Sequence, residues 1–183
     1  MKHSASSPVR FLLILTAALL AACSRQIPEK TPDAANAAQD ETHLPVVIRT
    51  GAGARRFDVE VALSTQDQAK GLMFRKELAP DGGMLFPMFP PRTASFWMKD
   101  TLIPLDMLFI RTDGTIVFLK ANAVPYSREP VSAGVPVAAV LELAGGRAAA
   151  LGIKEGDRVA WGPCATEPQP RRARERLNFC PGS

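Results

Sequence analysis

The sequence predicts a mainly β domain of the α+β class, with two short helices, folded as a β-sandwich or a closed barrel. Many short segments are apolar or alternate between apolar and polar residues, which is typical of strands. Gly- and Pro-containing turns separate these segments, and only two stretches carry helix signals. We expect a single domain over residues 44–163, a length that can bury one hydrophobic core.

The first two predicted strands are Pro45–Thr50 and Phe57–Leu63, separated by a Gly-rich turn. In the second strand, apolar residues from Phe57 to Leu63 fall on one face, and Asp58 and Glu60 fall on the other. This alternation is typical of a strand that is buried on one side only.

Four further strands are predicted in the second half of the domain. Leu105–Arg111 and Thr115–Ala121 are joined by a turn containing Asp113-Gly114, a strong hairpin signal. Both strands are apolar on both faces, so we expect them to lie centrally in the sheet. Val137–Leu143 and Asp157–Trp161 complete the set.

Two short helices are predicted. Thr65 followed by Gln68 resembles a capping box and indicates a helix that runs to about Met73. The second helix spans residues 146–151 and ends at Gly152, a residue type that commonly terminates helices.

Several ordered blocks between residues 59 and 161 resemble a known family. They are Val61-Ala62, Gly71-Leu72-Met73-Phe74-Arg75, Gly83-Met84-Leu85-Phe86, Phe96-Trp97-Met98-Lys99-Asp100-Thr101, Ile103-Pro104-Leu105-Asp106, Glu142-Leu143 and Gly156-Asp157. The chain is similar in these blocks to the bacterial and archaeal family known as domain of unknown function 192. The resemblance implies a compact jelly-roll-like β fold and no established activity. The family often has Asn where this chain has Asp100.

The first 22 residues have the features of a secretory signal peptide. Lys2, His3 and Arg10 form a basic start, and an uncharged apolar run covers residues 11–22. This run is shorter than the roughly 20 apolar residues that a membrane-spanning helix needs.

Leu20-Ala21-Ala22-Cys23 resembles the lipobox of bacterial lipoproteins. The resemblance implies cleavage before Cys23, acylation of its thiol and firm attachment to a membrane through several acyl chains. Ser24 in place of Asp implies the outer membrane, facing the periplasm, if the host has two membranes. The alternative is an ordinary signal peptide with an incidental cysteine.

Residues 23–43 are rich in Ala, Pro, Gln and acidic residues and are expected to form a flexible tether. Removal of residues 1–22 lowers the formal charge from +4 to +2. A charge this small, together with export, argues against a nucleic-acid partner. The expected partners are a membrane, through the lipid anchor, and a small ligand, glycan or envelope protein. Composition does not define the oligomeric state.

The domain lacks the residues that most metal sites and nucleophilic enzymes use. The chain's two histidines are His3, in the signal, and His43, in the tether, and no cysteine lies between residues 24 and 163. This excludes His-based triads, the usual zinc sites and a thiol nucleophile in the body of the domain. No nucleotide-binding fingerprint occurs, and we expect no cofactor.

The candidate site residues are charged or aromatic side chains on otherwise apolar segments. Asp106 shares a strand face with Leu108 and Ile110, and Glu142 shares one with Val140. A carboxylate on an apolar face needs donors or a cation, because unpaired burial costs several kcal/mol. Five residues could converge on one polar pocket with an aromatic wall: Arg75, Trp97, Lys99, Asp106 and Glu142.

Two interpretations of this group remain open. In one, Arg75 and Lys99 neutralise the two carboxylates within a structural network; in the other, the group lines a binding or catalytic pocket. The leading hypothesis is a non-enzymatic envelope lipoprotein that binds a small ligand, glycan or protein. The alternatives are a carbohydrate-active hydrolase or lyase that uses Asp106 and Glu142, and a purely structural accessory protein.

Five methionines lie within a short stretch: Met73, Met84, Met88, Met98 and Met107. Thioethers suit Cu(I), yet Met84 and Met98 lie inside hydrophobic runs and no histidine assists them. Packing in the core is the better explanation from sequence, and no metal site is predicted.

The C-terminal extension, residues 164–183, lies beyond the family pattern. Cys164 and Cys180 are expected to form a disulfide in an oxidising envelope, with free thiols or an interchain bridge as the alternatives. The Arg-rich segment 171–176 between them is a solvated charged turn or a contact with anionic lipid or polysaccharide.

Overall fold

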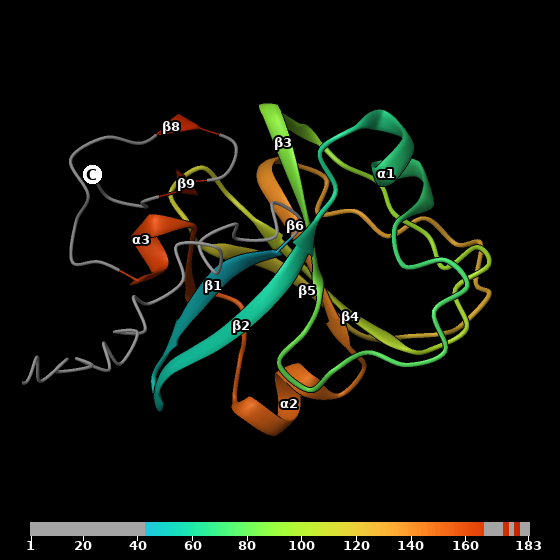
Figure 1. The fold of residues 1–183 in the computed structure, drawn as a ribbon, viewed down its shortest axis with the longest axis horizontal. Coiled ribbons are helices and arrows are strands. Elements are labelled where there is room, and N and C mark those ends of the chain that lie inside the picture. Colours follow the sequence, from blue (N-terminus) through green and yellow to red (C-terminus); the bar gives the residue numbers. More distant parts are fainter. Residues whose placement is uncertain (1–42, 167–173, 176–177, 180–183) are drawn as a thin grey trace, which may run out of the picture. The chain divides into compact units, whose positions relative to one another are not determined.

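The computed structural model describes residues 43–166, 174–175 and 178–179, which form a mainly β fold (Figure 1). The predicted signal peptide, Cys23, nearly all of the tether and most of the C-terminal extension lie outside these residues. Within the described segments, no helix combines the length and apolarity needed to cross a bilayer.

The first hairpin joins β1 (His43–Thr50) to β2 (Gly53–Val61). Thr50 pairs with Gly53, so the turn contains only two residues and β2 begins earlier than the sequence predicted. The apolar residues Phe57 and Val59 of β2 are buried, and Asp58 and Glu60 face the other way, as the alternation indicated.

The capping box of helix α1 (Thr65–Lys70) lies one residue earlier than predicted. Ser64 is the N-cap, its side chain accepts a hydrogen bond from the Asp67 N–H, and the Asp67 carboxylate accepts one from the Ser64 N–H. The expected pair of Thr65 and Gln68 is therefore wrong, because Ser and Asp provide the same exchange one position earlier. The helix ends at Gly71, which has a positive φ of 50°.

Strand β3 (Met84–Thr93) was not predicted. Its prolines, Pro87, Pro90 and Pro91, argue against a strand, because proline cannot donate a ladder hydrogen bond. The structure accommodates them because the pairing of β3 with β6 shifts register between Pro87 and Arg92. The apolar start of the strand pairs regularly, and the proline-rich part lies in the irregular section.

The remaining main strands are β4 (Leu105–Ile110), β5 (Ile116–Ala123), β6 (Pro136–Ala144) and β7 (Arg158–Trp161). The sheet order is β5-β4-β6-β3-β2-β1-β7-β9-β8, in which β8 (Arg174–Glu175) and β9 (Asn178–Phe179) are two-residue strands. Strand β4 lies between two neighbours and is buried throughout. Strand β5 is half exposed at the start of the order, so the expectation that it lies centrally is wrong.

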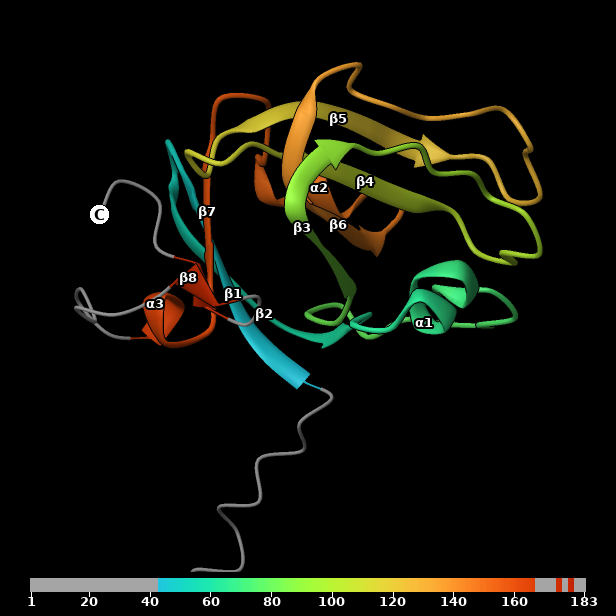
Figure 2. The same cartoon turned by 90° about the horizontal axis from the view of Figure 1, so that it is seen from above.

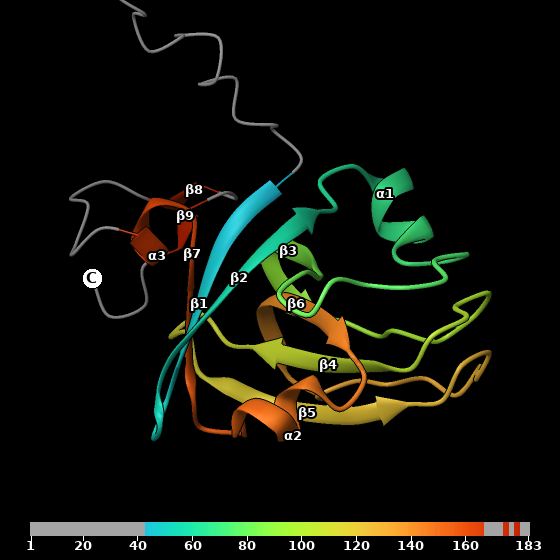
Figure 3. The ribbon, with the colours of Figure 1, turned by 60° about the horizontal axis from the view of Figure 1, so that its bottom comes forward.

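The sheet is mixed, because β2 pairs with β3 in parallel while the other ladders are antiparallel. It is also strongly bent (Figures 2 and 3). The bend brings β7 to the start of β5, where the Val159 N–H donates to the Gly114 carbonyl at 2.8 Å. The sheet does not close into a barrel, and the fold is best described as an α+β sandwich-like arrangement.

Two hydrophobic clusters lie on opposite faces of the central strands. The first core lies inside the bend and draws residues from β1 to β7 and α2; it includes Val46, Ile48, Phe57, Val59, Leu108, Ile110, Leu141, Leu143, Ala148 and Trp161. The second core lies on the other face of β3, β6 and β4, beneath loops; it includes Leu72, Met84, Phe86, Met88, Met98, Leu105, Met107, Phe109 and Val140. Each central strand therefore sends alternate residues to the two cores.

Helix α2 (Arg147–Leu151) occupies the predicted position and ends at Gly152, whose φ of 69° suits glycine. Its residue Ala148 packs into the first core. Helix α3 (Pro163–Thr166) was not predicted and follows β7 directly.

Candidate functional site

Asp106 is fully buried and its carboxylate is satisfied by backbone donors. Its Oδ1 accepts hydrogen bonds from the N–H groups of Asn122, at 2.8 Å, and Gly146, at 3.0 Å. Its Oδ2 accepts one from the Ala148 N–H at 2.7 Å. The side chain thus ties the end of β5 and the start of α2 to strand β4, and neither carboxylate oxygen faces an open cleft.

Glu142 lies on the opposite face of the sheet from Asp106. In the pairing of β4 with β6, Asp106 is opposite Leu143 and Met107 is opposite Glu142. Leu143 belongs to the first core and Met107 to the second, so the two carboxylates point in opposite directions. The structure does not supply the pair of facing carboxylates that glycoside cleavage requires.

Burial without a partner dominates the chemistry of Glu142. The residue is 4% exposed, and no hydrogen bond or ion pair to its carboxyl group occurs within the described part of the chain. Removal from water disfavours the charged form and raises the pKa of Glu142 to about 8. The group is therefore a neutral acid at pH 7, an unusual state for a glutamate.

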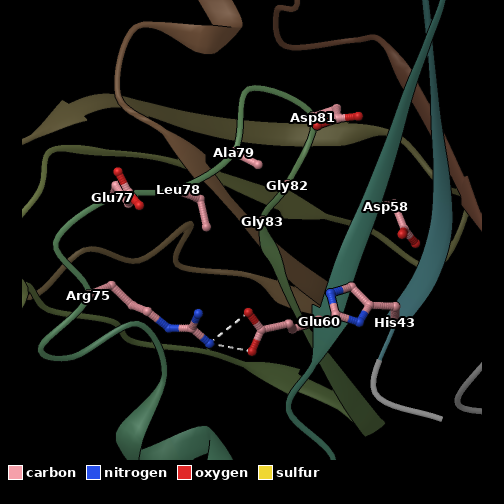
Figure 4. A pocket seen from close by; sticks show the side chains of 10 residues that line it. All are labelled: His43, Asp58, Glu60, Arg75, Glu77, Leu78, Ala79, Asp81, Gly82 and Gly83. Atoms are coloured by element: carbon pink, nitrogen blue, oxygen red, sulfur yellow. Dashed lines mark hydrogen bonds and ion pairs between the residues drawn. The ribbon is translucent and has the colours of Figure 1, made fainter. Parts of the chain in front are cut away.

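Arg75 contacts a different carboxylate from those predicted. One terminal nitrogen, Nη2, donates to both carboxylate oxygens of Glu60 and lies 2.6 Å from Oε1 (Figure 4). The two side chains are largely solvent-accessible, so the ion pair contributes at most about 1 kcal/mol to stability. The ion pair fixes the orientation of the Arg75 guanidinium beside the end of β2.

The Arg75–Glu60 pair borders a pocket of about 290 Å³. The other lining residues come from the start of β1, from β2 and from the loop before β3: His43, Asp58, Glu77, Leu78, Ala79, Asp81, Gly82 and Gly83 (Figure 4). Four carboxylates and one guanidinium line the pocket, so it favours polar ligands over apolar ones. Among the described residues, no three His, Cys, Asp or Glu side chains are placed to hold a metal ion.

Trp97 and Lys99 lie together at the surface, away from Asp106 and Glu142. The Lys99 Nζ is 5.8 Å from the centroid of the Trp97 ring and 3.9 Å from the Asp100 carboxylate. Lysine over an indole face is a favourable cation–π arrangement. The five predicted residues therefore do not converge on one pocket.

Three loops at one end of the fold instead carry exposed aromatic side chains. Phe74 is 65% exposed, Trp97 50% and Tyr126 60%, and Val124 is exposed beside Tyr126. These residues belong to the segments 71–76, 96–101 and 124–131, which lie at the end remote from β7 and α3 in two views (Figures 2 and 3). We call Phe74, Trp97, Val124 and Tyr126 the aromatic loop surface.

Backbone hydrogen bonds connect the three loops to one another. The Phe74 N–H donates to the Asp100 carbonyl at 2.8 Å, and the Tyr126 N–H donates to the adjacent Thr101 carbonyl at 3.2 Å. Phe74 and Tyr126 adopt positive φ values of 64° and 62°, which bulky side chains rarely do. Such conformations cost about 1–3 kcal/mol each and concentrate at functional sites. Both rings are exposed to solvent and do not enter the core.

Sequence reasoning found part of this surface. Trp97 was predicted by its position opposite Phe96 and Met98, and Phe74 lies next to the predicted Arg75. Nothing in the sequence around Tyr126 signals its position, because its contact with Thr101 joins distant segments.

The lipidation and disulfide predictions lie largely outside the described residues. Cys23 and Cys180 are not among them. Cys164 is buried in α3, and its pairing with Cys180 stays a prediction. The Arg-rich segment is described only at two backbone positions of β8.

The model of the family DUF192, described as an uncharacterized ACR, matches residues 46–161. This chain belongs to that family. The matched segment begins in β1 and ends with β7, so it contains both cores, Asp106, Glu142 and the aromatic loop surface. None of the curated proteins matches this DUF192 chain.

Two solved structures are similar to this chain. A protein of unknown function from Novosphingobium aromaticivorans is 48% identical, with a TM-score of 0.63 over 64% of this chain and 84% of that one. A protein from Sinorhizobium meliloti, provisionally named a transcription regulator, is 43% identical, with a TM-score of 0.62 over 64% of this chain and 92% of that one. Both confirm the fold of this DUF192 domain.

The contacts of Asp106 predict that Asp106→Asn destabilises the fold by about 3 kcal/mol or more. The amide replaces one accepting oxygen with a donor that faces N–H groups, and it removes the charge that strengthens these bonds. Asp113→Asn is the matched control, because its carboxylate accepts from the Thr115 N–H in an exposed turn. Urea unfolding at pH 7 measures both variants, and equal losses would contradict a special role for Asp106.

The raised pKa of Glu142 predicts that stability falls as pH rises from about 4.5 to about 8. The folded state keeps this proton while the unfolded chain releases it, so the free energy of unfolding decreases by about 1.4 kcal/mol per pH unit in that interval. Glu142→Gln removes this contribution. Its stability should match that of the unmodified chain at pH 4 and exceed it at pH 8 in urea unfolding; a parallel pH dependence of the two proteins would contradict the assignment.

Proposed function

We propose that this chain is an envelope lipoprotein, anchored through Cys23, whose domain binds a glycan of the cell envelope without catalysing a reaction. The observation that carries the proposal is the aromatic loop surface, whose three rings are exposed and two of which lie on residues with positive φ. Sugar rings present apolar C–H faces that pack on aromatic side chains, and their hydroxyls need polar neighbours.

Polar groups beside the aromatic loop surface support a glycan ligand. Lys99 and Asp100 lie next to Trp97, and Arg75 follows Phe74 and borders the pocket with Glu60. Both signs of charge alternate here, so the surface lacks the strong positive field that would favour anionic lipid or nucleic acid.

The placement of the carboxylates supports binding without catalysis. The Asp106 carboxylate accepts three backbone hydrogen bonds, and Glu142 lies on the opposite face of the sheet, in the second core. Neither carboxylate lies on the aromatic loop surface, so a sugar bound there would have no general acid and base from this pair.

Binding of a glycan to this surface should change the fluorescence of Trp97. Purified full chain is titrated with isolated peptidoglycan and with a soluble chitin oligosaccharide, and intrinsic fluorescence is recorded. We expect a blue shift as Trp97 leaves water, while Trp161, which is only 2% exposed, stays silent. Trp97→Ala should weaken binding by about tenfold or more.

Phe89→Ala is the control for this experiment, because Phe89 is an exposed aromatic residue on β3, outside the three loops. Its affinity should equal that of the unmodified chain. Absence of binding to either glycan, or equal losses in the Trp97 and Phe89 variants, would sink the proposal.

The anchor is tested separately by Cys23→Ser, which removes the thiol that accepts lipid. We expect the protein to move from the membrane fraction to the soluble fraction of fractionated cells. Ser24→Ala, which keeps the thiol, should stay with membranes. Unchanged membrane retention of Cys23→Ser would contradict the anchor and leave the glycan proposal untouched.

A further inference from the structure

Two methionines flank the unpartnered acid Glu142 in the sheet. Strand β6 lies between β3 and β4, and Glu142 is paired in register with Met84 on one side and Met107 on the other. Residues paired in register point to the same face, so the three side chains stand side by side in the second core.

The three side chains are withdrawn from water but not completely sealed. Met107 is fully buried, whereas Met84 and Glu142 each keep a small exposed fraction. No donor or cation of the described residues meets the Glu142 carboxyl group. A buried polar group without a partner costs free energy, and each such group in a native structure calls for an explanation.

The donor set selects a narrow class of ligand. Two thioethers and one carboxylate cannot satisfy Mg²⁺ or Ca²⁺, which need about six or more oxygens. They also lack the thiolates and imidazoles that zinc sites use. Thioether sulfur prefers soft ions, of which Cu(I) is the biological one. Its single positive charge would replace the proton on the Glu142 carboxyl group, and that proton leaves to solvent.

We propose that Met84, Glu142 and Met107 form a binding site for Cu(I). Adjacent strands lie about 4.8 Å apart, so the two methionine backbones stand roughly 10 Å apart. Two flexible thioether side chains on either side of Glu142 have the reach to bring their sulfurs to one ion, and the carboxylate would supply the third ligand. The site lies apart from the aromatic loop surface and does not depend on glycan binding.

The same geometry separates these methionines from the others. Met88 lies on the same strand and in the same core as Met84, but it has no register partner among the acidic residues. Core packing remains sufficient for Met88, and it provides a matched comparison.

The test uses the purified full chain with its thiols alkylated, and Ag(I) as a redox-inert substitute for Cu(I). We expect one ion retained per chain after gel filtration, measured by mass spectrometry. Competition titration should show affinity reduced at least about tenfold in Glu142→Gln, Met84→Leu and Met107→Leu. Met88→Leu should bind as tightly as the unmodified chain.

The leucine substitutions conserve volume, and thermal unfolding without metal shows that each variant is folded. X-ray absorption on the loaded protein gives an independent readout, in which sulfur neighbours of the ion are expected. Failure to retain Ag(I), retention that survives all three substitutions, or a spectrum with only oxygen and nitrogen neighbours would each overturn the proposal.

Discussion

The architecture depends on the Asp106 carboxylate and the three backbone N–H groups that it accepts from. Asn122 lies near the end of β5, and Gly146 and Ala148 lie after β6 at the start of α2, so one side chain fixes the end of β5 and the β6–α2 connection against β4. A charge buried in the interior is tolerated because each hydrogen bond to it is strong. A carboxylate that already accepts three hydrogen bonds has little capacity left for a ligand. Ligand binding is therefore expected in other parts of the domain.

Glu142 shows how strand register divides two similar residues between different roles. Both carboxylates lie on neighbouring central strands, but a side-chain period of two sends them to opposite faces. Asp106 meets the ends of chain segments, which offer unpaired N–H groups, whereas Glu142 meets the thioethers of Met84 and Met107, which offer none. One carboxylate therefore accepts three backbone hydrogen bonds, whereas burial without a donor raises the pKa of the other. The contrast arises from the neighbours of each residue and not from the residue type.

Sequence patterns predicted the helices and strands better than the strand register and the contacts between distant segments. The hairpin at Asp113-Gly114 and the glycine end of α2 were predictable because their causes are local. Strand β3 was not predicted, because its prolines fit only where the ladder with β6 is interrupted. The burial of Asp106 and Glu142 followed from their apolar strands, but their opposite faces depend on a register that the sequence does not reveal. The aromatic loop surface needed Phe74 and Tyr126 to meet the backbone at Asp100 and Thr101, contacts between distant segments that no local pattern encodes.

The central claim is that Asp106 serves the fold while the loop end of the domain meets the ligand. Chemical-shift mapping of the amide groups during titration with a soluble envelope glycan tests it directly. The account predicts that the largest changes occur at Phe74, Trp97, Asp100 and Tyr126. The amides of Asn122, Gly146 and Ala148, which bind Asp106, should stay unchanged. Changes concentrated on those three amides, with the loop residues unaffected, would contradict it.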